Sequence, residues 1–583
     1  MINIDSLTIK ALIAEIAQVF TSGRVQKVQQ PNRDDLLLFL RSGGKSYKFF
    51  ISINPKYPHA AFIGENGEKC RNIEIPKIPP MFCMLLRKHL EGAKIRSVHQ
   101  PDYERIIEIG FESYNELGAR VPLLLAIELM GKHSNIVLYN ADTNMILGSA
   151  HGIGSEKSRE REIAGGLPYV YPPKQKKFDI LKLSEHEFYN LAKILSDPLD
   201  IWLNKSFHHI SLALATELCE TVGISTDKNT VSTSSVEKLN ELYKLIVKTL
   251  RLENLNPSVS KDKRLFSLTG LSPDVQWDEV ESVNSMIDNY FAHHVYKDKF
   301  SKLKSQLTSA VNRELKKGNS SYFKHSLSIE SGDKASKYKL FADLLMANLN
   351  NIKSNSESAI VNNYLDENKE IIIPLDSSKT ALNNAQHYYK LYNKAKNAAK
   401  KAEELLNNIK KDLDYFESIL VSIDMAENLS DLTQIQKELL SQEILKTERS
   451  KTKIKEDKEA LNPLKYDLQN GYSIYIGRNN RQNDYIVSQI ASPDDIWLHT
   501  QNIQGSHVLI KVTGEEVPDE VLLEAANLAA CFSKAGGYSN VPVIYTKRRF
   551  LKKPPGAKPG YVTYSGEKTI IVTPDRNLIK KLT

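Results

Sequence analysis

The chain has 583 residues, of which 41% are hydrophobic and 25% are charged, a composition typical of soluble proteins with roughly three to five domains. No window approaches the roughly 18 uncharged apolar residues of a transmembrane helix. The first residues carry Asp5 and Glu15 and lack a basic start, so we expect neither membrane insertion nor a signal peptide. The net charge of +8 favours a polyanionic partner only mildly.

The cysteines are far apart in the sequence and have neither CxxC nor Cys/His metal-ligand spacing. We therefore expect reduced thiols inside a cytoplasmic protein, with no metal and no other cofactor. No nucleophile is paired with a base in the sequence, so no catalytic residue is predicted. The four cysteines are Cys70, Cys83, Cys219 and Cys531.

Residues 1–173 are predicted to form an α+β domain that ends at a Pro172-Pro173 linker. An amphipathic helix is expected over residues 6–20, and a second helix follows Pro79-Pro80 and ends at Gly92. Short alternating segments between turn residues predict strands. We expect these strands at residues 24–30, 35–41, 45–53, 60–63, 94–99, 105–112, 121–127 and 135–139.

Two polar stretches of this domain exceed what a core requires. Glu104 and Arg105 form an adjacent acid–base pair at the start of a strand, and they fit either a surface ion pair or a binding site. Polar residues also crowd around Gly131, between Glu128 and Asn135. His133, within this second stretch, is more typical of a hydrogen-bonded turn than of a ligand or base.

Residues 174–295 are predicted to be helical. The segment around His208-His209 resembles a helix-hairpin-helix unit, which holds a nucleic-acid backbone through the amides of its turn. Such turns usually contain glycine, which is replaced here by the two histidines, so the motif is weak.

Residues 296–458 are predicted to form a long antiparallel coiled-coil hairpin. Apolar residues between positions 388 and 423 recur at alternating steps of four and three, which indicates a narrow seam against a second helix. A strand-like segment at 358–374 separates the two arms and predicts a small tip. The alternative is a coiled coil used only for dimerisation. The polar residues 318–336 are expected to interrupt the first arm.

Residues 459–583 are predicted to form an α/β domain. It contains a strand at 471–477, a polar loop at 478–484 and a helix over 519–535. His499 and His507 are expected to hydrogen-bond in its core, with RNA contact as the alternative. A proline-rich stretch near its end carries six cations and no acid, and we expect it to contact RNA phosphates through Lys547, Arg548, Arg549, Lys552, Lys553 and Lys558.

Several ordered motifs along the whole chain can be compared with known families. They lie at residues 79–89, 128–135, 344–349, 384–396, 477–484, 495–511 and 552–560. Together they resemble the NFACT family of ribosome-associated quality-control factors. The resemblance implies four parts with the boundaries given above: an NFACT-N domain, a helix-hairpin-helix domain, the coiled-coil hairpin and an NFACT-R domain.

The resemblance also implies a function and its partners. A protein of this kind binds rRNA and tRNA on a large ribosomal subunit that still carries a stalled peptidyl-tRNA. It recruits alanyl-tRNA, so that the nascent chain gains an untemplated alanine tail, and it works with the small RNA-binding tailing partner RqcP. The ribosome forms the bond, so we expect no enzyme but a cytoplasmic, ribosome-associated factor.

The family's tRNA-contact residues map onto two sites of this chain. Its Asp-Arg pair falls on Glu104 and Arg105, and its Glu-Ile-Met stretch falls on Glu128, Leu129 and Met130. An arginine holds a phosphate or a base edge, and a neighbouring acid orients it or accepts from a base amine. Glutamate in place of aspartate lengthens the acidic side chain by one methylene.

Two other functions were compared with this interpretation. Gram-positive members of the family are often described as fibronectin-binding, so a surface adhesin is the alternative function, with fibronectin as its partner. The first two domains are also similar in layout to formamidopyrimidine-type DNA glycosylases. Those enzymes need a proline nucleophile after the initiator methionine, whereas this chain begins Met1-Ile2-Asn3. The sequence therefore argues against a glycosylase.

Overall fold

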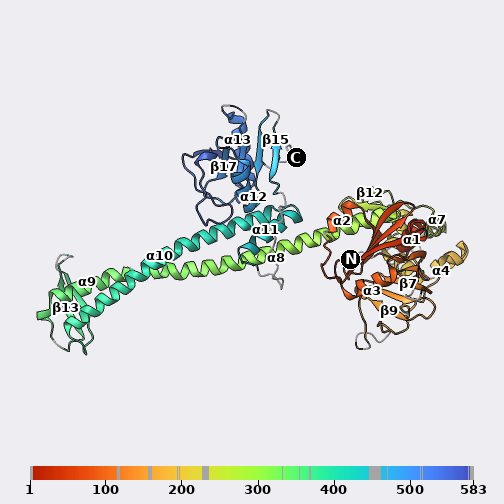
Figure 1. Cartoon of the computed structure of the whole chain (residues 1–583), viewed down its shortest axis with the longest axis horizontal. Helices are drawn as coiled ribbons and strands as arrows, with labels where there is room; N and C mark the ends of the chain where they lie inside the picture. The colour runs from red at the N-terminus through yellow and green to blue at the C-terminus, as the bar shows by residue number, and fades with distance from the viewer. Residues whose placement is uncertain are drawn as a thin grey trace. The chain divides into compact units, whose positions relative to one another are not determined.

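In the computed structural model the chain forms two compact units, Met1–Asp298 and Lys299–Thr583, which are described separately (Figure 1). The structure describes residues 4–575 and 577, apart from positions 72, 115–117, 155, 157–160, 194, 196, 226–235, 331–332, 354, 365, 367–368, 446–460, 469–470, 513 and 515.

Unit 1 is built on a nine-stranded antiparallel sheet with the strand order β4-β3-β2-β1-β5-β6-β7-β8-β9. All eight predicted strands are present, while β9 and the short helix α2 (Glu65–Arg71) were not predicted. The strands are β1 (Arg24–Gln29), β2 (Asp35–Ser42), β3 (Lys45–Ser52), β4 (His59–Phe62), β5 (Lys94–His99), β6 (Ile106–Tyr114), β7 (Arg120–Glu128), β8 (Asn135–Asn140) and β9 (Ile146–Ser149).

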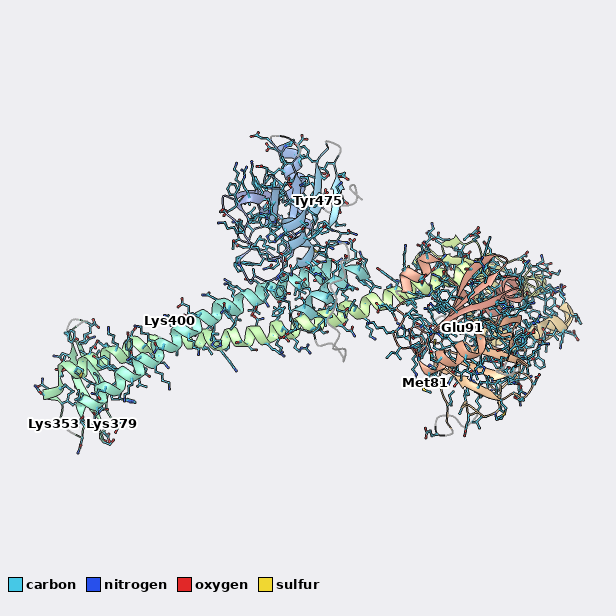
Figure 2. The ribbon with its side chains drawn as sticks, viewed as in Figure 1. Met81, Glu91, Lys353, Lys379, Lys400 and Tyr475 are labelled. Atoms are coloured by element: carbon cyan, nitrogen blue, oxygen red, sulfur yellow. The ribbon has the colours of Figure 1, made fainter. Side chains whose placement is uncertain are left out.

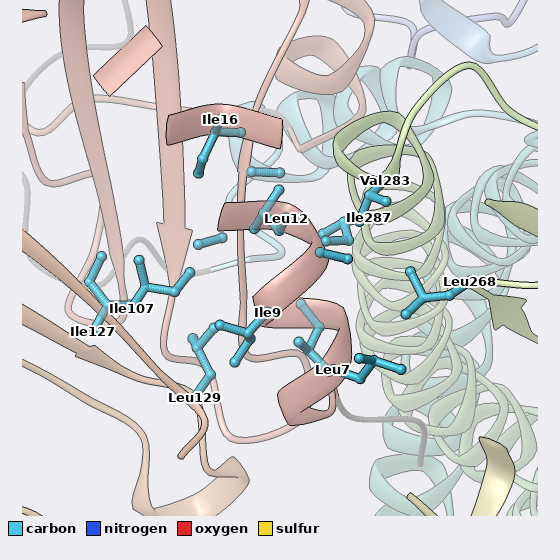
Figure 3. Packing of buried hydrophobic residues seen from close by; sticks show 14 of the residues in the cluster. Leu7, Ile9, Leu12, Ile16, Ile107, Ile127, Leu129, Leu268, Val283 and Ile287 are labelled. Atoms are coloured by element: carbon cyan, nitrogen blue, oxygen red, sulfur yellow. The ribbon is translucent and has the colours of Figure 1, made fainter. Parts of the chain in front are cut away.

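Helix α1 (Ser6–Thr21) joins this sheet to the helical part of unit 1. Asp5 caps it by accepting a 2.8 Å hydrogen bond from the backbone N–H of Thr8. Its apolar face, with Leu7 and Leu12, packs in one core together with Ile107 of β6 and Ile287 of the long helix α8, Val283–Glu330 (Figure 3). Helix α3 (Met81–Leu90) begins directly after Pro80, as predicted.

The segment after Pro173 contains the expected helices and also a small sheet that was not expected. Its three strands pair in the order β11-β10-β12, so the prediction of a purely helical segment was wrong in this respect. The strands are too short for a periodic signal to appear in the sequence. The elements are α4 (Glu185–Lys193), α5 (Leu199–Ser206), α6 (Leu212–Thr221), α7 (Val236–Leu250), β10 (Ser258–Ser260), β11 (Phe266–Ser267) and β12 (Trp277–Glu279).

Unit 2 contains the predicted antiparallel helical hairpin (Figure 1). Its arms are α8 (Val283–Glu330), which begins in unit 1, and α10 (Ala381–Met425), and Leu307 and Val311 of α8 share a core cluster with Ile419 of α10. The stretch 318–336, expected to interrupt the first arm, is helical as far as Glu330, where α8 ends, and the next helix is α9 (Asp333–Ala347). After α10, the shorter helix α11 (Leu429–Ser441) packs on the same cluster.

The tip of the hairpin carries the predicted strands. Strands β13 (Ser358–Asn363) and β14 (Lys369–Pro374) pair antiparallel and pack against α9 (Asp333–Ala347) through a small apolar cluster. Lys353 and Lys379 lie at this tip (Figure 2).

The last part of unit 2 is a six-stranded antiparallel sheet with the order β15-β16-β18-β17-β19-β20, covered by α13 (Asp519–Cys531). The buried alanines Ala525, Ala526, Ala529 and Ala530 let this helix lie close to the sheet. The strands are β15 (Leu464–Asp467), β16 (Ser473–Ile476), β17 (Ile496–Thr500), β18 (Val508–Lys511), β19 (Val541–Lys547) and β20 (Lys568–Val572).

The polar stretch at 478–484 was predicted to be a loop, which is wrong, since most of it forms helix α12 (Asn480–Tyr485). Asn479 caps this helix by accepting from the backbone N–H of Gln482. The segment is buried against the hairpin: the Asn479 amide donates to Gln434 Oε1 at 2.9 Å, and the Arg478 guanidinium lies 3.0 Å from Asp431. Its polar residues therefore hold the sheet domain on the base of the hairpin.

Candidate nucleic-acid interface

A cleft of about 960 Å³ opens in unit 1, between the end of the large sheet and the turn that joins α5 to α6. It is lined by charged, aromatic and apolar side chains. Among these are Asp5, Tyr103, Glu104, Arg105, Met130, Arg161, Lys177, His208 and His209. Three of the four residues that the sequence assigned to tRNA binding therefore line one cleft.

Glu104 and Arg105 directly precede β6. The backbone holds them in place, because Gln100 Nε2 donates to the Glu104 carbonyl at 2.7 Å and the N–H of Leu129 donates to the Arg105 carbonyl at 2.8 Å. Both side chains are partly exposed, and neither forms an ion pair with another described residue. Burial raises the pKa of Glu104, against the lowering effect of the Arg105 guanidinium. The pair is thus positioned toward the cleft and available to a ligand.

An aromatic stack forms the wall beside this pair. The ring of Tyr103 lies on that of His208, with centroids 4.2 Å apart and planes 12° apart, and His209 meets Tyr103 edge-on at 5.0 Å. Burial lowers the pKa of His208 and lowers that of His209 to about 4, so both rings are neutral at pH 7. Flat neutral rings next to a guanidinium are suited to an unpaired nucleobase and its phosphate.

The turn between α5 and α6 has histidine at the place where a helix-hairpin-helix turn usually has glycine. His209 itself adopts the left-handed backbone conformation, with φ of 64°. Its Nδ1 lies 3.0 Å from Ser6 Oγ, and its ring packs on Tyr103. These contacts stabilise a conformation that a non-glycine residue rarely adopts.

Glu128 does not lie in the cleft, in contrast to the direct tRNA contact expected from the sequence. Its carboxylate is fully buried, accepting from Arg161 Nη1 at 2.7 Å and from the Tyr169 hydroxyl at 2.8 Å. Burial lowers the pKa of Arg161, but the hydrogen bond to Glu128 and the charge of that carboxylate raise it. The net result is a raised pKa. Glu128 therefore positions Arg161, which lines the cleft, and Met130 lines it directly.

Arg161 and Lys177 also line the cleft, although the sequence did not predict them as binding residues. The Lys177 ammonium donates to the Asn204 carbonyl at 2.6 Å, which fixes it at the cleft wall. Burial lowers its pKa, and Glu104 opposes this shift. The run of cations Lys174, Lys176 and Lys177 after the two prolines was a signal that could have found it.

In unit 2, most of the six cations predicted to contact RNA have partners within the protein. Asp494 pairs with both Lys547 and Arg549, while Asp484 pairs with Lys553. Lys558 lies 3.8 Å from Asp412 of the hairpin and 3.3 Å from Gln442. The Arg548 guanidinium donates to the Val487 carbonyl, whereas Lys552 is exposed and forms no ion pair with a described residue.

The two histidines of this domain belong to its interior. His507 is buried against Trp497, and His499 stacks on the same indole with planes 4° apart. Burial lowers the pKa of both imidazoles. Among the described residues, no group of three or more His, Cys, Asp or Glu side chains could hold a metal, and no helix has the length and apolarity to span a bilayer.

Comparison with known families agrees with this architecture. Residues 5–458 match the family described as "NFACT N-terminal and middle domains", and residues 464–566 match "NFACT protein RNA binding domain". The chain therefore belongs to the NFACT family.

Two of its relatives extend over the full length. "Rqc2 homolog RqcH" of Bacillus subtilis (strain 168) is 32% identical over 584 residues, which cover 100% of this chain and 99% of the relative. The protein of the same name from Streptococcus suis (strain 05ZYH33) is 29% identical, with 100% of both chains covered. The C-terminal part of the fibronectin/fibrinogen-binding protein from Streptococcus suis covers 49% of this chain and 99% of its own, at 30% identity and a TM-score of 0.39.

Proposed function

We propose that this chain is a ribosome-associated quality-control factor that binds RNA. It would bind large ribosomal subunits that carry a stalled peptidyl-tRNA, and recruit alanyl-tRNA for untemplated alanine tailing of the nascent chain. The full-length relatives named as Rqc2 homologues and the match to an RNA-binding domain support the proposal. In this proposal the protein positions the tRNA, the ribosome forms the bond, and the protein works in the cytoplasm with RqcP as a further partner.

The observation that carries the tRNA part is the grouping of Glu104, Arg105 and the Tyr103–His208 stack in one cleft. Single-stranded loops of RNA are read by stacking on rings and by hydrogen bonds to base edges, and a guanidinium adds contact to a phosphate. The arrangement thus supports binding of a tRNA loop with an unstacked base. No feature of the described residues favours fibronectin, so the adhesin alternative is not proposed.

The test replaces both Glu104 and Arg105 with alanine. Because neither side chain forms an ion pair with another described residue, thermal stability should change little, whereas tRNA binding and alanine tailing should fall sharply. The matched control replaces Lys205 and Asp197, an exposed ion pair of unit 1 at 3.0 Å that lies outside the cleft lining. Normal tailing by a folded Glu104/Arg105 double variant would contradict the tRNA assignment.

Sequencing the RNA that co-purifies with the chain tests the wider proposal. Large-subunit rRNA together with one tRNA family is the expected result. Absence of ribosomal RNA from the purified material would overturn the proposal of a ribosome-associated factor.

A further inference from the structure

An exposed aromatic surface lies at one end of β19, in the domain that matches the RNA-binding family. Phe550 is 44% exposed and Tyr561 is 47% exposed, although large aromatic side chains usually contribute to cores. We name Phe550, Lys552 and Tyr561, together with Arg549, the Tyr561 face. The exposure of these rings means that their apolar area is available to a partner.

Phe550 and Tyr561 each precede a residue of one antiparallel bridge by two positions, so they lie on opposite sides of that bridge, with Lys552 between them along the strand direction. Lys552 and Thr563 pair through two reciprocal hydrogen bonds of 2.8 Å, so the two segments run side by side. Leu551 and Val562, which directly follow Phe550 and Tyr561, pack in the same apolar cluster. The segments are therefore anchored by their inward residues.

Cations accompany these rings. The Arg549 guanidinium lies 5.8 Å from the centroid of the Phe550 ring, and it also pairs with Asp494. Lys552 is exposed and makes no ion pair with a described residue. Since Lys547, Lys553 and Lys558 also have acidic partners, the cations alone form a weaker phosphate site than the sequence suggested.

We propose that the Tyr561 face binds single-stranded RNA, with bases stacked on Tyr561 and Phe550 and a phosphate held by Lys552. Stacking on aromatic side chains requires unpaired bases, because the bases of a duplex are already stacked on one another. This inference rests on the proposed RNA-binding function and specifies the form of RNA that this domain takes. A duplex would be held only through its phosphates, and four of the six cations from Lys547 to Lys558 already have acidic partners.

The test measures binding of a fluorescent 12-nucleotide single-stranded RNA and of the matching RNA duplex to the full chain. The Glu104/Arg105 double-alanine chain serves as the parent, so that the cleft of unit 1 is disabled. The single strand should bind the parent more tightly than the duplex. Changing Phe550 and Tyr561 together to alanine should weaken single-strand binding roughly tenfold or more at fixed salt, without a change in salt slope.

Lys552→Ala should instead lower the slope of log affinity against log salt by about 0.7, the value for one phosphate contact to a single strand. Tyr561→Phe should bind like the parent, because the ring remains. Tyr538→Ala is the matched control, since Tyr538 is 65% exposed but precedes the opposite end of β19.

Equal or tighter binding of the duplex, or unchanged single-strand binding by the double aromatic variant, would overturn the inference. In that case co-purification of ribosomal RNA and tRNA with the unmodified chain would show that the proposed function still stands. Loss of that co-purification, with single-strand binding at the Tyr561 face intact, would instead contradict the proposed function alone.

Discussion

Arg161 and Glu128 form a buried ion pair directly behind the cleft of unit 1, in which Arg161 Nη1 donates to Glu128 Oε1 at 2.7 Å and Nη2 contacts Oε2. The Tyr169 hydroxyl completes the coordination of the carboxylate. The family resemblance assigns Glu128 to direct tRNA contact, but in the structure Glu128 contacts Arg161, and it is Arg161 that lines the cleft. The effect of Glu128 on binding would pass through the position of Arg161.

Glu128→Gln should therefore destabilise unit 1. Removing one charge of a buried pair leaves the other uncompensated, which costs about 3 kcal/mol or more. Urea denaturation of the full chain measures this change in the free energy of unfolding. Asp197→Asn is the control, since its exposed pair with Lys205 should contribute about 0–1 kcal/mol. Equal stability of Glu128→Gln and wild type would show that the pair is not needed for the fold.

The cationic segment predicted to bind RNA should contribute less salt dependence than its composition suggests. If all six cations contacted phosphates, neutralising them would lower the slope for single-stranded RNA by about 4. Because Asp412, Asp484 and Asp494 already face this segment, we expect a decrease of about 2. Binding titrations at several salt concentrations measure the slope. A slope that does not change would mean that the segment makes no phosphate contact.

Glu438, which contacts Tyr415 of the hairpin and Asn480 of the last domain, should make the free energy of unfolding depend on pH. Burial raises its pKa to about 7, although hydrogen bonds from Tyr415 and Asn480 lower it. Between the ordinary value of 4.5 and about 7, the folded chain holds a proton that the unfolded chain has released. Stability should thus fall as pH rises through this interval, by at most about 1.4 kcal/mol per pH unit, and stay constant above it.

Glu438→Gln should remove this dependence, because the amide keeps an acceptor oxygen but does not ionise. Thermal unfolding of unit 2 between pH 5 and 8 measures it, with the exposed Glu443→Gln as control. An identical pH profile for Glu438→Gln and wild type would show that the carboxyl ionises without cost. Asp484 and Arg481 also face this group and must be kept unchanged in the comparison.

Leu406→Pro tests the function of the hairpin. Proline in the middle of α10 removes a backbone hydrogen bond and clashes with the preceding turn, which costs about 3 kcal/mol locally. We expect this variant to bind free tRNA normally but to co-sediment poorly with large ribosomal subunits, while Leu406→Ala should behave closer to wild type. Loss of tRNA binding with normal subunit binding would reverse the roles assigned to the two units.

Much of the fold was predictable because it depends on local patterns. The spacing of apolar residues predicts both the seam of α10 and the strands of the large sheet. The turn residues between the strands predict where they end. Helix α12 was missed because Asn479, Asn480 and Asn483 favour turns and caps in isolation. Its stability comes from Gln434 and Glu438, which approach only in the folded chain.

The candidate site was predictable in part for the same reason. Glu104 and Arg105 are neighbours in the sequence, so their proximity in the cleft needed no tertiary information. Neither the burial of Glu128 nor the approach of His208 to Tyr103 is visible from spacing, since each joins segments that are distant along the chain. The acidic partners of the cationic segment were missed because they come from other elements.

Gly318 of α8 faces Leu413 of α10 so closely that a Cβ atom in its place would lie 2.7 Å from Leu413 Cδ2. A shift of the arms by one helical turn would bring Glu314 or Tyr322 to this point, and either side chain would have to displace Leu413. The close contact at Gly318 therefore disfavours sliding of one arm along the other. With α10 about 68 Å long at 1.5 Å per residue, the hairpin sets the distance between the strands of the tip and the base. A particle that contacts both must present binding sites with that spacing.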